Sequence, residues 1–246
     1  MTMTTSNPAL GSNVFLSQRS YADRTNTMTI QGTVYKTILL LLVCMLSAGW
    51  TWMQFYKGAA IAPWLMVGLI GGFITAMVTV FKQAWAPITA PLYALLEGLF
   101  IGGLSAQLEM NFPGIVIQAA GLTFGTLFSM LVAYQSGLIK ATERFKFGVV
   151  AATGGIAIVY LVTLVLSFFG VHASFMYSSS WLSIGISLFV VVIAALNFII
   201  DFDFIEQGAK QGVAKYMEWY GAFALMVTLV WLYIEFLRLL SKLKER

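Results

Sequence analysis

Five acidic residues lie in or beside long apolar stretches of the sequence: Glu97, Asp201, Asp203, Glu218 and Glu235. An ionised side chain at the centre of a membrane-spanning helix costs roughly 2.5–3.5 kcal/mol, so each of these acids needs a structural or functional reason. Carboxylate oxygens bind hard cations such as Ca²⁺, and they also take up protons. The five acids therefore indicate a cation site whose charge depends on pH.

Two of these acids also have simpler interpretations. Glu97, in the stretch YALLEGLFIGG, could be a protonated acid that is hydrogen-bonded to a neighbouring helix. Glu235 could pair with Arg238, which follows one helical turn later. Either interpretation would make the acid a structural element of the bundle.

The remaining acids lie around the end of one apolar stretch and the start of the next. Asp201 and Asp203 are separated by a single residue, so they point to different sides of a helix, and we expect only one to face the bundle interior. Glu206 follows them, and Glu218 opens the next apolar stretch. For Glu206 and Glu218 we expect an interfacial position near solvent.

Signatures of catalysis are absent from the sequence, which contains no HExxH, GxSxG, P-loop or paired CxxC motif. His172, the only histidine, falls in an expected outer loop, and Cys44, the only cysteine, excludes an intrachain disulfide. The net charge of +4 is spread between apolar segments, so we expect no nucleic-acid partner. We predict a protein that is not an enzyme and has no cofactor beyond transient Ca²⁺.

The elements that must position these acids are membrane-spanning helices. Hydrophobic residues make up 59% of the 246 residues and charged residues only 10%, whereas soluble domains carry about 25% charged residues. A span needs about 20 mostly apolar residues, and seven segments qualify: 33–55, 61–81, 87–108, 113–134, 147–169, 181–204 and 219–240. We predict an all-α seven-helix membrane domain over residues 33–240, with a flexible cytoplasmic tail at 1–32 and a short basic tail at 241–246.

The positions of lysine and arginine predict the orientation. Nine of the 14 basic residues fall on the N-terminal side of the expected membrane, which the positive-inside rule places in the cytoplasm. Seven spans then put the C-terminus outside, although Arg238, Lys242, Lys244 and Arg246 argue against that placement. The alternative is a re-entrant segment with both ends inside; we favour the seven-span arrangement.

Small residues predict close helix packing. Three GxxxG pairs allow helix backbones to approach within a bilayer, either inside one bundle or between two copies; they are Gly68/Gly72, Gly98/Gly102 and Gly121/Gly125. We favour packing within the bundle.

The last two apolar segments carry a family resemblance. DFDFI at residues 201–205 and LYIEFLRLL at residues 232–240 resemble the Bax inhibitor-1 family and its bacterial YccA-like branch, and the EGLFIGG stretch and long N-terminal tail agree. The resemblance implies a C-terminal helix surrounded by the other six. It also implies a pH-sensitive passive calcium leak governed by two aspartates, one in each of the last two helices.

By position, the first of these aspartates corresponds to Asp201, and the second falls on Glu235, whose longer side chain changes the geometry of the pair. A hairpin turning near residues 208–212 would place Asp201 opposite residues 221–223, about twelve residues or 18 Å from Glu235. On that spacing Glu218 is the nearer partner. The metal-ligand candidates on motif grounds are Asp201 and Glu235.

The resulting hypothesis is a leak for Ca²⁺ or a similar cation in a bacterial inner membrane, with Glu97 as an accessory acid. An alternative is a non-conducting regulator that binds other membrane proteins, such as proteases, through its bundle and tail. A further alternative is a proton-coupled transporter of small solutes, which predicts saturable, substrate-specific uptake.

Overall fold

The computed structural model describes residues 27–170 and 180–246, and this part of the chain forms seven long helices and a short 3-10 helix. They are α2 (Ile30–Tyr56), α3 (Ala62–Phe81), η3 (Gln83–Trp85), α4 (Ala86–Asn111), α5 (Ile115–Gln135), α6 (Glu143–Phe168), α8 (Trp181–Gln211) and α9 (Met217–Lys244). All seven long helices are long and apolar enough to cross a membrane. The predicted all-α seven-span bundle is confirmed.

Several helices begin at residues that favour a helix start. Thr29, Thr142 and Ser180 cap α2, α6 and α8, and each side-chain oxygen accepts a hydrogen bond from the backbone N–H three residues later. A proline lies in the first turn of α3 and of α4, where a missing N–H does no harm. Local sequence therefore sets where these spans start.

The turn between α8 and α9 is tied to the residues that precede α2. α8 continues past the predicted end at residue 204 and stops at Gly212, whose φ of +63° suits a glycine C-cap. The Met28 N–H donates to the Val213 carbonyl at 2.8 Å, and Thr27 forms an isolated β-bridge with Ala214. The start of α2 and the α8–α9 turn therefore lie on one face of the bundle.

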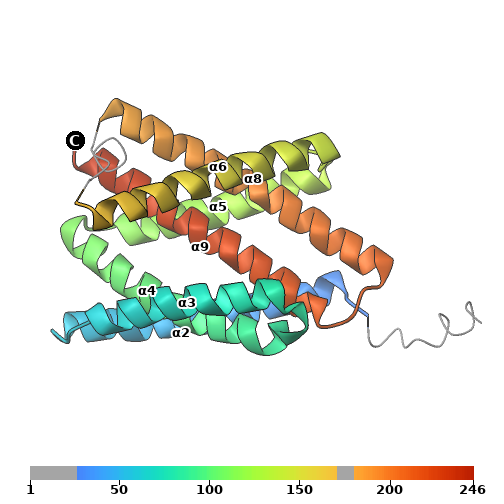
Figure 1. Cartoon of the computed structure of the whole chain (residues 1–246), viewed down its shortest axis with the longest axis horizontal. Helices are drawn as coiled ribbons and strands as arrows, with labels where there is room; N and C mark the ends of the chain where they lie inside the picture. The colour runs from blue at the N-terminus through green and yellow to red at the C-terminus, as the bar shows by residue number, and fades with distance from the viewer. Residues whose placement is uncertain (1–26, 171–179) are drawn as a thin grey trace, which may run out of the picture.

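Helix α9 crosses the centre of the bundle. Figure 1 shows it running obliquely between a group formed by α2, α3 and α4 and a group formed by α5, α6 and α8. It packs against α2, α4, α5 and α8, and Tyr160 of α6 reaches it through a side-chain hydrogen bond. The central position expected for the C-terminal helix is confirmed, although α3 packs chiefly on α4 and does not complete a ring around α9.

Two of the three glycine pairs bring helices together. A Cβ atom on Gly68 would lie 2.6 Å from the Leu96 carbonyl oxygen, and one on Gly102 would clash with the backbone of Ala48. These glycines permit α3 and α2, respectively, to approach α4 closely. The third pair does not pack inside the bundle as expected, because a Cβ on Gly121 or Gly125 meets nothing within 4 Å.

The end of the chain lies on the face opposite the α8–α9 turn. The Lys244 ammonium donates to the Pro113 carbonyl at 2.9 Å, and the Arg246 guanidinium lies 3.4 Å from the centroid of the Trp181 ring. Pro113 follows α4 and Trp181 begins α8, so both mark the far face. The two ends of the described chain therefore lie on opposite faces, as seven full crossings require.

Candidate functional site

Asp201 is half-buried and has one hydrogen-bond partner among the described residues. Its Oδ2 atom accepts a hydrogen bond of 2.6 Å from the Thr228 hydroxyl of α9. No described lysine or arginine lies within ion-pair distance of it. Asp201 precedes Gln211 by about ten residues, which places it about 15 Å from the α8–α9 turn. A carboxylate at this depth, with a hydroxyl and no cation beside it, is suited to bind a cation or a proton.

The contact with Thr228 corrects the predicted register of the hairpin. Asp201 lies opposite Thr228, and not opposite residues 221–223, because α8 runs on to Gln211 and the turn is centred near Ala214. Glu235 follows Thr228 by about seven residues, or about 10 Å along the helix, whereas Glu218 precedes it by about 15 Å. The expectation that Glu218 is the nearer partner is therefore wrong.

Glu235 is buried within a hydrogen-bonded cluster. Its side chain is 1% exposed, and its Oε1 atom accepts hydrogen bonds from the Tyr160 hydroxyl at 2.8 Å and from the Arg238 guanidinium at 3.2 Å. The same guanidinium group donates to the Tyr160 oxygen at 2.5 Å. The pairing of Glu235 with Arg238 is confirmed, and Tyr160 is a third member that the sequence analysis missed.

Glu218 is equally buried, which contradicts the expected solvent-near position. One carboxylate oxygen forms an ion pair with Lys36, and the other accepts hydrogen bonds of 2.9 Å from both the backbone N–H and the hydroxyl of Thr29. A Cβ atom on Gly32 would overlap the carboxylate. The start of α2 covers Glu218 completely, so this acid fastens α2 to α9.

Asp203 and Glu206 join α8 to α5 and α6. Lys146 lies 2.7 Å from an Asp203 oxygen, Lys210 lies 2.5 Å from a Glu206 oxygen, and the Tyr134 hydroxyl donates to Glu206. Asp203 thus faces α6 while Asp201 faces α9, which confirms that they point to different sides of the helix. Only Asp201 contacts the central helix α9, as expected for the one aspartate that faces the bundle interior, and Asp203 pairs with Lys146 of α6.

Glu97 lies apart from the other acids, between α4 and α3. It is half-buried, and its Oε2 atom would lie 2.9 Å from a Cβ atom placed on Gly72. Its carboxylate makes no hydrogen bond or ion pair with any described residue, so the alternative of a bond to a neighbouring helix is not supported.

Lys242, near the end of α9, is a buried basic residue that the sequence predicted only as a determinant of orientation. Lys242 is 4% exposed; its ammonium donates to the Ser187 hydroxyl at 2.8 Å and to the Ser183 carbonyl at 3.3 Å. Thr228, Glu235 and Lys242 recur at seven-residue spacing, which places them on one face of a helix. That spacing was the signal that could have identified Lys242.

A preformed metal cluster is not present in the described part of the chain, where no three His, Cys, Asp or Glu side chains come together. His172 lies outside the described residues. The two proposed ligands Asp201 and Glu235 are held by different partners, about two turns apart along α9. The groups along α9 form what we call the polar line: Asp201 with Thr228, then Glu235 with Arg238, then Lys242. The line begins with a carboxylate on the side of the α8–α9 turn and ends with an ammonium group on the side of the C-terminus.

A known protein family matches this chain. The family model described as Bax inhibitor 1 like matches residues 7–245, nearly the whole chain, including both helices that carry the polar line. No curated protein and no solved structure matches the chain.

Proposed function

Because the chain belongs to the Bax inhibitor 1 like family of membrane proteins, we propose that it is a passive leak for Ca²⁺ or a similar cation, controlled by protonation of intramembrane carboxylates. The observation that supports this proposal best is the Asp201 carboxylate, bonded to the Thr228 hydroxyl and without a described basic partner. We place the protein in a bacterial inner membrane, with the face of the α8–α9 turn in the cytoplasm.

Asp201 supplies the chemistry that a cation site requires. When ionised, its carboxylate and the Thr228 oxygen offer hard oxygen ligands, and its negative charge has no fixed cation to satisfy it among the described residues. When protonated, it loses the charge that attracts a cation. Each of the other acids on α8 and α9 is already held by lysine or arginine.

The cluster of Glu235, Tyr160 and Arg238 acts as the gate in this proposal. It lies about two turns beyond Thr228, the residue of α9 that contacts Asp201, and it ties α9 to α6. The Arg238 charge repels a cation that has passed Asp201, so conduction requires the guanidinium to move aside. Release from Arg238 would free Glu235 to bind the passing ion.

Flux measurements test the proposal directly. The full chain is reconstituted into vesicles that contain a Ca²⁺ indicator, and uptake is followed at acidic and neutral pH. Asp201→Asn should lower the flux and remove its pH dependence, whereas Glu143→Gln, which neutralises an acid with a 91% exposed side chain, should change neither. If the leak of Asp201→Asn equals the wild-type leak at both pH values, Asp201 is not the cation site.

One observation favours the alternative of a non-conducting regulator. Thr27 and Met28 hold the segment before α2 against the α8–α9 turn, so a protein bound to residues 1–26 would be connected to both helices of the polar line. Deletion of residues 1–26 separates the two functions while it keeps Thr29, the partner of Glu218. A regulator would lose its partner in a pull-down, whereas the leak should persist in vesicles.

A further inference from the structure

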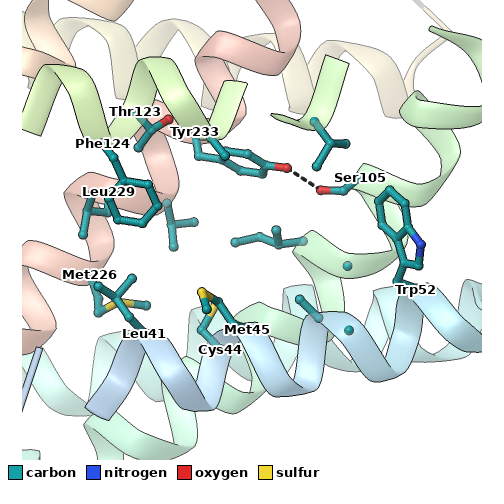
Figure 2. A pocket seen from close by; sticks show the side chains of 17 residues that line it. Leu41, Cys44, Met45, Trp52, Ser105, Thr123, Phe124, Met226, Leu229 and Tyr233 are labelled. Carbon is teal, nitrogen blue, oxygen red and sulfur yellow. Dashed lines mark hydrogen bonds between the residues drawn. The ribbon is translucent and has the colours of Figure 1, made fainter. Parts of the chain in front are cut away.

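A cavity of about 270 Å³ lies between α2, α4, α5 and α9 (Figure 2). Its wall includes the buried side chains of Cys44 and Leu229, which are 7% and 4% exposed. Met45 and Phe124 also line it, but they are 57% and 37% exposed. Because Met45 and Phe124 lie near the midpoints of α2 and α5, the cavity faces the lipid at the depth of the bilayer core.

The hydroxyl groups that line the cavity already have partners. The hydroxyls of Tyr233 and Ser105 lie 2.8 Å apart, as Figure 2 shows, and the Thr123 hydroxyl donates to the Ala119 carbonyl at 2.8 Å. No buried side-chain polar atom in the described part of the chain lacks a hydrogen-bond partner. The cavity therefore offers little to water or to a polar ligand, which need unsatisfied partners.

We propose that this cavity binds an acyl chain of a bilayer lipid, which enters between α2 and α5 past Met45 and Phe124. The entrance is continuous with the lipid-facing surface of both helices, so the chain need not leave the hydrocarbon layer. An apolar cavity of about 150 Å³ suffices to bind benzene, and the cavity here is larger, so it accommodates a chain segment of several carbons. An empty cavity would forfeit the dispersion contacts of its walls.

The lining also limits which part of a lipid can enter. None of the residues that line the cavity carries a charged side chain. A phosphate group or a fatty-acid carboxylate would lose its hydration there without gaining a cationic partner. The occupant is therefore the apolar tail of a lipid, with its head group remaining outside the cavity.

A photoreactive lipid identifies the occupant. The full-length protein is placed in nanodiscs with a phosphatidylcholine whose acyl chain carries a diazirine near its middle, and adducts are mapped by mass spectrometry after photolysis. We expect adducts on Cys44 and Leu229, which lipid on the outer surface reaches poorly. An outward residue such as Leu46, 74% exposed, reports ordinary bilayer contact.

Two glycine variants provide a matched comparison. Gly49 lines the cavity, and a Cβ atom there meets nothing within 4 Å, so Gly49→Phe puts a ring into the space. Gly154 of α6 also has an unobstructed Cβ direction but does not line the cavity. Adducts on the inner wall should fall several-fold in Gly49→Phe and stay unchanged in Gly154→Phe, with Leu46 labelled equally in both.

A second obstruction keeps the test decisive if Gly49→Phe does not fold. Ala120→Phe narrows the same cavity from α5 and should give the same loss. Wild-type adducts confined to outward residues would overturn the proposal. So would inner-wall adducts that persist in both cavity variants, or that fall equally in Gly154→Phe.

Discussion

The Thr228 hydroxyl and the Asp201 carboxylate, 2.6 Å apart, set the register of α8 against α9 and thereby order the charges along the bundle. From this contact α9 leads through the Glu235–Arg238 pair to the buried Lys242. Along α9, a cation that has passed the Asp201 carboxylate next meets the positive charges of Arg238 and then Lys242. The proposed leak therefore has its binding site and its barrier on the same helix pair.

The Thr228 contact can be tested by two substitutions, of which only one keeps the hydroxyl. Thr228→Val keeps the side-chain shape but removes the donor to Asp201, whereas Thr228→Ser retains it. We expect Thr228→Val to lower Ca²⁺ flux into vesicles several-fold, because the site loses an oxygen ligand and the carboxylate loses its described hydrogen bond. Thr228→Ser should stay close to wild type. Equal flux in the two variants would show that the hydroxyl has no part in the site.

The Tyr160 hydroxyl should contribute to stability through Glu235. Tyr160→Phe removes the 2.8 Å hydrogen bond to Glu235 and keeps an aromatic ring beside Arg238, whose guanidinium lies 4.9 Å from the ring centroid. We expect the free energy of unfolding to fall by about 0.6–1.7 kcal/mol, which are the average and the maximum for side-chain hydrogen bonds between membrane helices. Unfolding in a denaturing detergent measures this loss, and Tyr35→Phe, at a 71% exposed tyrosine, is the control. Equal losses in the two variants would contradict a specific role for Tyr160.

The fold was predictable because hydropathy is a local property of the chain. Seven apolar stretches predicted seven spans, and the Glu235–Arg238 pair was predictable because its members are one turn apart. The end of α8 was missed for the same reason: beyond residue 204 the sequence turns polar, but the helix continues as far as Gly212. That extension moved the partner of Asp201 from residues 221–223 to Thr228.

The partners that the acids find on other helices were not predictable from local sequence. Lys36 and Glu218 are 182 residues apart, and Tyr160 and Glu235 are 75 apart, so these contacts exist only once the helices pack. Lys36 enters the sequence prediction only as one of the basic residues that set the orientation, and Glu218 is expected near solvent, although Lys36 and Thr29 cover it in the folded bundle. Helix packing, and not residue type, decides which of these acids has a basic partner.

The contact between α2 and Glu218 predicts a large difference between two glycines of one helix. A Cβ on Gly32 would overlap the Glu218 carboxylate, whereas a Cβ on Gly49 meets nothing within 4 Å. Gly32→Ala should therefore destabilise the protein by about 1–3 kcal/mol, the usual cost of disrupting hydrogen bonds to a buried charged group. Gly49→Ala should be neutral or stabilising by up to about 1 kcal/mol, because alanine favours helix.

Detergent unfolding of the two alanine variants tests this prediction. Glu218→Asp in the Gly32→Ala background should restore part of the loss, since the shorter acid withdraws from the new methyl group. Similar stabilities for Gly32→Ala and Gly49→Ala would mean that the Glu218 cluster does not hold α2 to α9.

Lys242 should oppose both stability and cation flow. It is a buried ammonium bonded to a hydroxyl and a carbonyl, and it has no ion pair with any described carboxylate. Such a charge is costly to bury, so Lys242→Met should leave the free energy of unfolding unchanged or raise it by about 1 kcal/mol.

Lys242→Met should also raise Ca²⁺ flux through the proposed leak, because it removes a fixed positive charge from the end of α9. Lys244→Met is the matched control, since Lys244 is exposed and bonds the Pro113 carbonyl. Flux that rises equally in both variants would assign the effect to surface charge, and flux that rises in neither would remove Lys242 from the barrier.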